Sequence, residues 1–375
     1  MIKPNIKDLT CEELEKWLAQ CKEPRYRAGQ IRRWLFQKGG TSFSRMSDLS
    51  AELRRALEER FTISRLETLR RDVSSDGTVK FLFGLSDGLS VESVLIPEAK
   101  RLTLCISTQA GCGFGCAFCA TALLGLQRNL HSAEIIDQIL EARRSLPAGS
   151  RITHVVLMGM GEPLANYPET VKALRIMTDA GTGIGLSHRR VTLSTVGLVP
   201  QIKKLMEETQ VNLAISLHAA TDELRSKLMP VNRKYSLAQL IECCRSLPIP
   251  KRRRITFEYV MLRGVNHSPE DARRLSQLLR GVRSKINLIP FNPHAGSPFQ
   301  RPTQQEIEEF QNLLHAQGHQ VNVRAPRGDD IQAACGQLQG EHAYRGKDEG
   351  ERLRPEVQPE GIKDEIHPSS LSLYP

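Results

Sequence analysis

The stretch Cys112-Gly-Phe-Gly-Cys116-Ala-Phe-Cys119 carries three cysteines at x3 and x2 spacing, directly after an apolar run at 102–108 that we predict to be a buried strand. Three closely spaced thiolates on a flexible glycine loop can bind three irons of a [4Fe-4S] cluster and leave the fourth iron open. A structural zinc site is the alternative, but such sites need four ligands and usually combine two CxxC pairs. No second pair is present, so we predict a cluster.

This motif resembles that of the radical S-adenosylmethionine (SAM) superfamily, in which the amino and carboxylate groups of SAM chelate the fourth iron. The resemblance implies that an electron from the cluster cleaves SAM to a 5′-deoxyadenosyl radical, which is chemistry of the cofactors and not of side chains. Phe118 precedes the last cysteine, as an aromatic residue commonly does in that superfamily.

The composition is that of a large intracellular enzyme. A chain of 375 residues with 40% apolar residues can bury a substantial core, with room for one large and one small domain. It has nine cysteines, and its start, Met-Ile-Lys-Pro-Asn-Ile-Lys, lacks an apolar signal core. No apolar stretch approaches the length of a membrane span. We therefore expect a cytoplasmic protein in a reducing compartment, with no membrane partner.

The N-terminal region is basic and is predicted to be helical. The net charge is +10, and residues 22–71 hold 13 Lys and Arg against 6 Asp and Glu. Helix starts recur at Thr10, Pro24 and Ser50. Basic residues alternate with aromatic ones, as an RNA-binding surface needs; they are Arg25, Arg27, Arg32, Arg33 and Lys38, around Tyr26, Trp34 and Phe36. In the alternative interpretation, Trp34 and Phe36 are core residues and the arginines a solvated face.

Short alternating runs at 79–85 and 89–96, separated by Asp87-Gly88, predict a β-hairpin. Further along, apolar strands alternate with amphipathic helices, which predicts a parallel sheet covered by helices. The expected strands are 103–108, 154–158, 190–194, 212–217, 256–261 and 286–290, with helices such as 133–144, 169–180, 236–247 and 269–280. Six such units fit an α/β fold, an incomplete (β/α)6 barrel with its chemistry at the carboxyl ends of the strands.

Polar motifs fall at those ends. The second strand runs into Met158-Gly-Met-Gly161-Glu162-Pro-Leu, where Glu162 can accept from a ligand ammonium. In the superfamily such a segment holds the amino group of SAM. Polar residues at the ends of the later strands give a plausible ring of contacts to the ribose, carboxylate and adenine of SAM, although each could also be a loop cap or a satisfied core group. The full set of expected SAM contacts is Gly161, Glu162, Ser194, Ser216, Leu217, His218 and Asn292.

Further motifs in the sequence resemble one family within this superfamily. Met158-Gly-Met-Gly-Glu-Pro-Leu, Ser194-Thr-Val-Gly, Ser216-Leu-His218, Phe257-Glu-Tyr-Val-Met and Asp330-Ile-Gln-Ala-Ala-Cys335-Gly-Gln-Leu resemble the RlmN/Cfr family of radical SAM RNA methyltransferases, in order from about residue 9 to 338. The resemblance implies a radical SAM barrel at 99–340 with a C-terminal catalytic cysteine segment. It also implies a helical RNA-binding accessory domain at 1–72, with the hairpin at 73–98 as a linker unit.

The family resemblance also implies the residue roles. Cys335 takes a methyl group from one SAM, and a second SAM yields the radical that removes a hydrogen from that methyl. The methylene radical then adds to adenine, Glu92 removes the ring proton, and Cys105 attacks the Cys335 sulfur to release methylated RNA. From the residues alone, Cys335 and Cys105 could be small buried hydrophobes. We interpret Cys11, Cys21, Cys243 and Cys244 as structural.

The predicted activity is methylation of adenosine C2 in 23S rRNA and, as in some family members, in tRNA. The alternatives are a Cfr-like C8 specificity and an Fe-S RNA-binding protein without methyl transfer. Turnover needs a low-potential electron donor and a disulfide reductant, and we expect a monomer. Lys251-Arg-Arg-Arg254 could contact phosphates or be a solvated turn. The charged, Pro-rich tail at 341–375 is expected to be disordered.

Overall fold

A computed structural model of the 375-residue chain describes residues 3–340, and the tail predicted at 341–375 lies outside the described residues. The strands are β1 Glu67–Val73, β2 Val79–Gly84, β3 Ser90–Glu98, β4 Arg101–Cys105, β5 Gln109–Gly111, β6 Leu126–Asn129, β7 His154–Leu157, β8 Val191–Thr195, β9 Asn212–Ser216, β10 Ile255–Met261, β11 Ser284–Pro290 and β12 Val321–Val323. The α-helices are α1 Cys11–Gln20, α2 Tyr26–Arg32, α3 Ala51–Arg60, α4 Ala120–Leu123, α5 Ser132–Arg144, α6 Tyr167–Thr178, α7 Val199–Glu208, α8 Asp222–Leu228, α9 Leu237–Ser246, α10 Pro269–Leu278 and α11 Gln304–Ala316.

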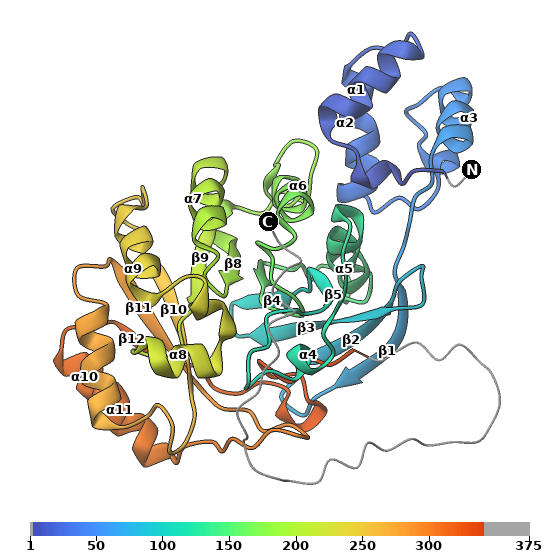
Figure 1. The fold of residues 1–375 in the computed structure, drawn as a ribbon. Helices are drawn as coiled ribbons and strands as arrows, with labels where there is room; N and C mark the ends of the chain where they lie inside the picture. The colour runs from blue at the N-terminus through green and yellow to red at the C-terminus, as the bar shows by residue number, and fades with distance from the viewer. Residues whose placement is uncertain (1–2, 341–375) are drawn as a thin grey trace. The chain divides into compact units, whose positions relative to one another are not determined.

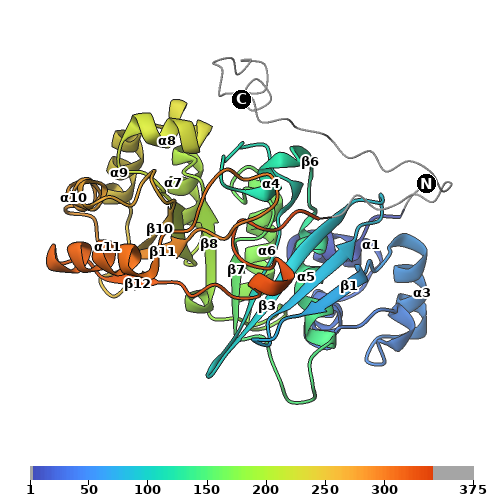
Figure 2. The same ribbon diagram turned by 90° about the horizontal axis from the view of Figure 1, so that it is seen from below.

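Ten strands form one sheet in the order β1-β2-β3-β4-β7-β8-β9-β10-β11-β12. From β4 to β12 all neighbouring pairs are parallel. The intervening helices follow one another along this curved sheet (Figures 1 and 2). The strands are rich in buried Val, Ile and Leu, as parallel strands covered by helices must be. The predicted incomplete (β/α)6 barrel is confirmed, with β12 as one further parallel strand.

The hairpin extends the same sheet. β1, β2, β3 and β4 pair antiparallel in sequence order, and β4 then pairs in parallel with β7. The sheet therefore does not stop at residue 98, and β1 begins inside the range predicted to be helical. The expected boundaries of the separate domains stay a prediction.

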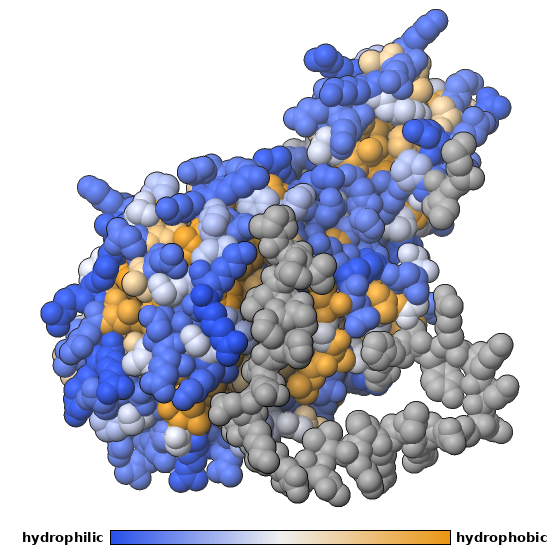
Figure 3. Space-filling model, in the orientation of Figure 1, coloured by the Kyte–Doolittle hydropathy of each residue, from blue (hydrophilic) through white to orange (hydrophobic). Residues whose placement is uncertain are grey.

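Two of the three N-terminal helices begin where the sequence predicts, and α2 begins at Tyr26, two residues after the predicted Pro24. Thr10 and Ser50 cap α1 and α3 through side-chain acceptors, which satisfies backbone N–H groups of the first turn. Charged groups join this region to α5: Lys7 pairs with Asp137, and Arg65 pairs with Glu141 at 3.0 Å between Nη2 and Oε2. Figure 3 shows that hydrophilic residues cover most of the outer surface of these helices in that view.

The aromatic residues of this region divide between core and surface. Phe36 is 1% exposed and Tyr26 is 60% exposed. The Trp34 ring lies under Lys38, and its Nε1 donates to Asp48 Oδ1 at 2.6 Å. Phe36 packs in the hydrophobic core, so for this residue the structure agrees with the alternative interpretation given above. Tyr26 and its exposed basic neighbours remain candidates for contacts with RNA bases and phosphates.

Candidate active site

The cysteine loop connects β5 to α4. The loop is preceded by Gly111, whose φ is +77°, and a Cβ there would lie 1.9 Å from the Gly125 oxygen. Only glycine fits such a position. The Cys112 N–H donates to that same oxygen at 2.9 Å, and the Cys119 N–H donates to the Cys116 oxygen at 3.1 Å. These two hydrogen bonds fold the loop back on itself, and all three cysteines lie on this folded loop.

The three buried thiols would need a positively charged partner to be present as thiolates. Burial raises the pKa of Cys112 to about 12, and it also raises the pKa of Cys116 and Cys119. Bound iron would reverse this, because a coordinating thiol is deprotonated outright. Among residues 3–340, no group of three or more His, Cys, Asp or Glu side chains is arranged to hold a single metal ion. The three thiols on one loop fit a [4Fe-4S] cluster with three protein ligands.

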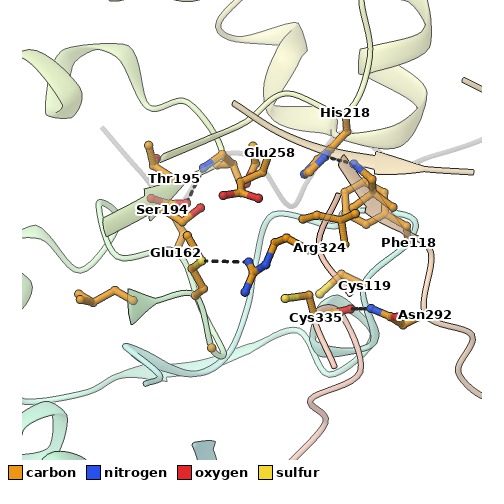
Figure 4. A pocket seen from close by; sticks show the side chains of 18 of the residues that line it. Phe118, Cys119, Glu162, Ser194, Thr195, His218, Glu258, Asn292, Arg324 and Cys335 are labelled. Carbon is orange, nitrogen blue, oxygen red and sulfur yellow. Dashed lines mark hydrogen bonds between the residues drawn. The ribbon is translucent and has the colours of Figure 1, made fainter. Parts of the chain in front are cut away.

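Two cavities lie inside the barrel. The first, here the carboxyl-end cavity, lies at the carboxyl ends of the strands (Figure 4). Of the expected SAM contacts it is lined by Gly161, Glu162, Ser194, Ser216, His218 and Asn292, together with Cys119. The second, here the lumen cavity, reaches the amino ends of the strands and is lined there by Arg101, His154, Arg190 and Lys285. Alternate residues of each strand face this interior, as the two-residue period of a strand requires.

Glu162 is a buried carboxylate that faces the carboxyl-end cavity. Oε1 accepts from the Leu164 N–H at 2.9 Å, and Oε2 accepts from the Val196 N–H at 2.8 Å. Burial raises the pKa of Glu162 to about 7 despite these bonds. Each carboxylate oxygen can accept more than one hydrogen bond, so the group remains able to bind a cation. Gly161 gives it access: φ is +96°, and a Cβ there would lie 2.5 Å from that of Gln109.

His218 lies at the carboxyl-end cavity as a neutral ring. Burial and the Arg225 charge lower its pKa to about 3. Because Nδ1 accepts from the Val260 N–H at 2.9 Å, the hydrogen of the neutral ring is on Nε2, which is therefore a donor. The ring also meets Phe118 edge to face. The Leu217 side chain, in contrast, is buried and does not line this cavity.

Arg225 organises the loops after β8 and β9, and sequence reasoning missed it. The residue is 0% exposed. Its Nη2 donates to the Val196 and Ser216 oxygens at 2.8 and 3.0 Å, and its Nε donates to the Leu217 oxygen at 3.1 Å. One guanidinium therefore holds both strand ends together. In the sequence it is only one more arginine of an amphipathic helix, α8, so no pattern indicated its position.

Cys335 lies on a loop that is docked at several points. Asn292 Nδ2 donates to the Cys335 oxygen at 3.1 Å, and the Ala120 N–H of α4 donates to the Gly336 oxygen at 2.8 Å. Thr121 Oγ1 donates to the Leu338 oxygen at 2.5 Å. The loop is thus fastened to the helix that follows the cluster cysteines. The Cys335 side chain lines both cavities.

Cys105 lines the lumen cavity from the end of β4. Burial and the nearby Cys335 raise its pKa to about 12, against the opposing effect of Arg324. The two cysteines predicted to act on the same sulfur chemistry, 230 residues apart in sequence numbering (335 minus 105), therefore lie close to one another. Neither is in a disulfide.

Glu92 contacts the end of the segment that carries Cys335. Its Oε2 accepts from the Gln339 and Gly340 N–H groups at 2.8 and 3.2 Å, and Oε1 pairs with Lys80 at 3.2 Å. The residue lines neither the carboxyl-end cavity nor the lumen cavity. In this structure Glu92 anchors the end of the Cys335 segment to β3.

The basic run at 251–254 precedes β10 and so lies at the amino end of that strand. Arg254 Nη1 donates to Gln320 Oε1 at 2.7 Å, and Arg253 donates to the Gln210 oxygen. Neither residue lines the carboxyl-end or the lumen cavity. The run is therefore not part of the candidate active site.

Matches to known proteins agree with this architecture. Residues 106–276 match the radical SAM superfamily, and residues 4–63 match the ribosomal RNA large subunit methyltransferase N-terminal domain. The chain is 50% identical over 337 residues to the dual-specificity RNA methyltransferase RlmN of Syntrophobacter fumaroxidans, over 90% of this chain and 98% of that protein. It is 52% identical over 336 residues to the protein of the same name from Geobacter sulfurreducens, over 90% of this chain and 92% of that one.

A solved structure shares the fold over nearly the whole described chain. The crystal structure of a radical SAM methyltransferase from Sphaerobacter thermophilus aligns with a TM-score of 0.85 and 44% sequence identity, over 90% of this chain and 100% of that one. Membership of the radical SAM superfamily implies a [4Fe-4S] cluster and SAM, in agreement with the thiol loop. The chain belongs to the RlmN family of radical SAM RNA methyltransferases.

Proposed function

We propose that this enzyme methylates C2 of an adenosine in 23S rRNA and in tRNA, with Cys335 as the methyl carrier. The observation that carries the proposal is the position of Cys335, whose side chain lines both the carboxyl-end cavity and the lumen cavity. A group that must meet SAM in one step and RNA in another needs access to both. The two relatives described above are named dual-specificity RNA methyltransferases, which supports two classes of RNA substrate.

Cys112, Cys116 and Cys119 would hold the cluster. The ring of expected contacts would hold SAM, with Leu217 acting through its backbone and Glu162 accepting from the ammonium. When bound, the reduced cluster and SAM supply a carbon radical that removes a hydrogen atom from the methyl on Cys335. Neutral His218 offers a donor from Nε2, and Asn292 keeps the Cys335 loop in place. These residues bind and orient, and the reacting sulfur is that of Cys335.

A protein carrier suits the target carbon. Adenine C2 is an electron-poor sp2 carbon that cannot attack the methyl of SAM, whereas a thiolate can. Addition to C2 leaves one unpaired electron on the ring. Glu92 removes the ring proton while this electron returns to the oxidised cluster, so that the aromatic ring is restored. Cys105 then attacks the Cys335 sulfur: an S–S bond forms and the S–C bond breaks. The electron pair that leaves with carbon takes a proton, so that RNA keeps the methyl group. A reductant must then reduce the Cys105–Cys335 disulfide, and a low-potential donor must supply electrons to the cluster.

The lumen cavity is the route for RNA. Its lining includes five Arg and Lys against two Glu, and four of its polar groups lie at the amino ends of the strands. Positive charge at such a mouth attracts the phosphate backbone. A nucleotide splayed out of a single-stranded loop could place its base inside. The exposed face of the N-terminal helices would bind the rest of the RNA. We expect the enzyme to act as a monomer in the cytoplasm. Among residues 3–340, no helix is long and apolar enough to cross a membrane.

Mass mapping of modified adenosines tests the proposal. RNA from cells that lack this protein, re-expressing either the native chain or Cys335→Ala, should differ by 2-methyladenosine in 23S rRNA and tRNA. An 8-methyladenosine product would instead assign the C8 chemistry of Cfr-like enzymes. If cells with the native chain contain no modified adenosine, only an RNA-binding function would remain, and the proposal would be overturned.

A further inference from the structure

Glu258 is a buried acid to which no role has been assigned. It lies in β10, is 4% exposed, and lines both cavities. Oε1 accepts from Asn287 Nδ2 on the neighbouring strand at 3.0 Å. Oε2 is buried and has no hydrogen-bond partner among the described residues. An unsatisfied buried carboxylate oxygen is costly, so this atom is in place to accept a hydrogen bond from a ligand.

Arg324 lies beside it, just beyond β12. Its N–H donates to the Leu288 oxygen at 2.9 Å, which fixes the backbone against β11. The guanidinium has one hydrogen bond within residues 3–340, from Nη1 to the Met158 sulfur at 3.8 Å. The charges of Cys335 and Glu258 raise its pKa. Figure 4 shows Arg324 between Glu258 and Cys335. Because its guanidinium makes one hydrogen bond within residues 3–340, its other N–H groups can donate to a ligand next to the Cys335 sulfur.

From this arrangement we infer that Glu258 and Arg324 bind the Watson–Crick edge of the target adenine: Glu258 Oε2 accepts from the N6 amine, and the Arg324 guanidinium donates to N1. The inference rests on the proposed function, since it concerns the base that enters the lumen cavity. It adds a base-recognition site to the catalytic cysteines.

The chemistry of adenine fits this pair. Along its Watson–Crick edge adenine presents a donor at N6, an acceptor at N1 and then C2. An acceptor and a donor side by side match the first two positions. They leave C2 as the next atom along the edge, beside Cys335. Guanine would place an acceptor and a donor against the same two groups, so it would meet both with the wrong polarity. C8 lies on the opposite side of the purine, away from this contact.

SAM is the competing ligand for Glu258. In the strand register Glu258 pairs with Ser216, one of the expected SAM contacts. Position favours the RNA base, because Glu258 and Arg324 both line the lumen cavity, which is the proposed route for RNA. The two ligands can be separated experimentally, because methylation of Cys335 needs SAM and no RNA.

The experiment combines RNA analogues with variants. Anaerobic, reconstituted enzyme is given RNA with adenosine, purine riboside (no N6 amine) or 1-deazaadenosine (no N1) at the target position, and initial methylation rates are compared. Native enzyme should prefer adenosine over either analogue by on the order of tenfold to a hundredfold, as for a lost hydrogen bond to a buried charged group. In Glu258→Gln the amide oxygen stays with Asn287, so an NH2 group faces the cavity. This variant should lose the preference for adenosine over purine riboside, and Arg324→Met should lose the preference for adenosine over 1-deazaadenosine.

Glu258→Gln should keep the preference for adenosine over 1-deazaadenosine, and Arg324→Met should keep the preference for adenosine over purine riboside. Both variants should still methylate Cys335 without RNA, measured by intact-protein mass. Glu223→Gln, on the exposed face of α8, serves as the charge-matched control. The inference is overturned if native enzyme methylates purine riboside as fast as adenosine, if Glu258→Gln leaves the ratio unchanged, or if Glu258→Gln stops methylation of Cys335, which would assign the residue to SAM. A failure of the proposed function differs from all three, because native enzyme would then form no methylated product from adenosine RNA.

Discussion

Asn292 Nδ2 donates to the backbone oxygen of Cys335 at 3.1 Å, and Asn292 Oδ1 in turn accepts from Arg301 Nη2 at 2.8 Å. Both polar ends of the amide are therefore used, and the residue ties the end of β11 to the loop of the carrier cysteine. This relation gives Asn292 a positioning role in addition to the expected contact with SAM.

Asn292→Asp should slow methylation of Cys335, because a carboxylate cannot donate to the Cys335 oxygen and repels it. Loss of this one buried hydrogen bond is worth about 1.4 kcal/mol, or roughly a tenfold decrease in rate. Intact-protein mass after timed incubation with SAM measures it. Asn312→Asp on the exposed face of α11 is the matched control. An unchanged rate in Asn292→Asp would show that the loop holds its position without this contact.

Cys112→Ala, Cys116→Ala and Cys119→Ala should each lose the iron and sulfide of the reconstituted protein, because each change removes one of the three expected protein ligands of the cluster. Iron, sulfide and zinc are measured after anaerobic purification. Cys21→Ala, an exposed cysteine outside the loop, should keep the full content. Stoichiometric zinc without iron in the native protein would restore the zinc-site alternative.

Local patterns were enough to predict the barrel and most of the cavity lining. Apolar runs placed the parallel strands, and the polar residues at their ends converge as the carboxyl edge of a parallel sheet requires. Residues such as Ser194, Ser216 and His218 could therefore be grouped from the amino-acid sequence alone. Their hydrogen bonds could not, because Arg225 reaches three backbone oxygens that no sequence spacing connects.

The contacts between distant segments were also beyond local patterns. Whether Phe36 faces solvent or core depends on what packs against it, so the alternation of basic and aromatic residues could not decide between the two interpretations there. Glu258 carried a weak signal, since it is an acid inside an otherwise apolar strand motif. Nothing in the sequence indicated that Arg324 lies beside it, because strand order in space fixes that neighbour.

The burial of Glu162 predicts a pH-dependent stability of the apoprotein. Its pKa is raised to about 7 in the folded state from a usual 4.5, so between these values the folded state binds more protons than the unfolded state. The free energy of unfolding should then decrease as pH rises from about 4.5 to 7, by on the order of 3 kcal/mol from this group. Glu162→Gln should flatten that decrease in urea titrations, and Glu223→Gln should not. Equal slopes for native protein and Glu162→Gln would contradict the assignment.

Glu92→Gln separates a base from an anchor. The amide oxygen can still accept from Gln339 and Gly340, but the side chain cannot take a proton. If Glu92 is the general base, the variant should methylate Cys335 normally and then accumulate enzyme joined to RNA, since the carbon bond forms before proton removal. If the carboxylate serves only to hold the Cys335 segment, product should form at nearly the native rate. Denaturing gels with and without nuclease, together with nucleoside mass analysis, distinguish the two.

Cys105 and Cys335 act in a fixed order, which gives the last prediction. Cys105 is needed only after carbon has bonded to RNA, whereas Cys335 is needed before, so Cys105→Ala should accumulate a covalent enzyme–RNA species and Cys335→Ala should give neither adduct nor product. Both cysteines line the lumen cavity, and the Cys335 charge raises the pKa of Cys105. Protein purified from cells should show nuclease-sensitive bands for Cys105→Ala alone, with Cys243→Ala as a control that turns over normally. If Cys105→Ala also turns over, or if both variants form the adduct, the two cysteines do not have these roles.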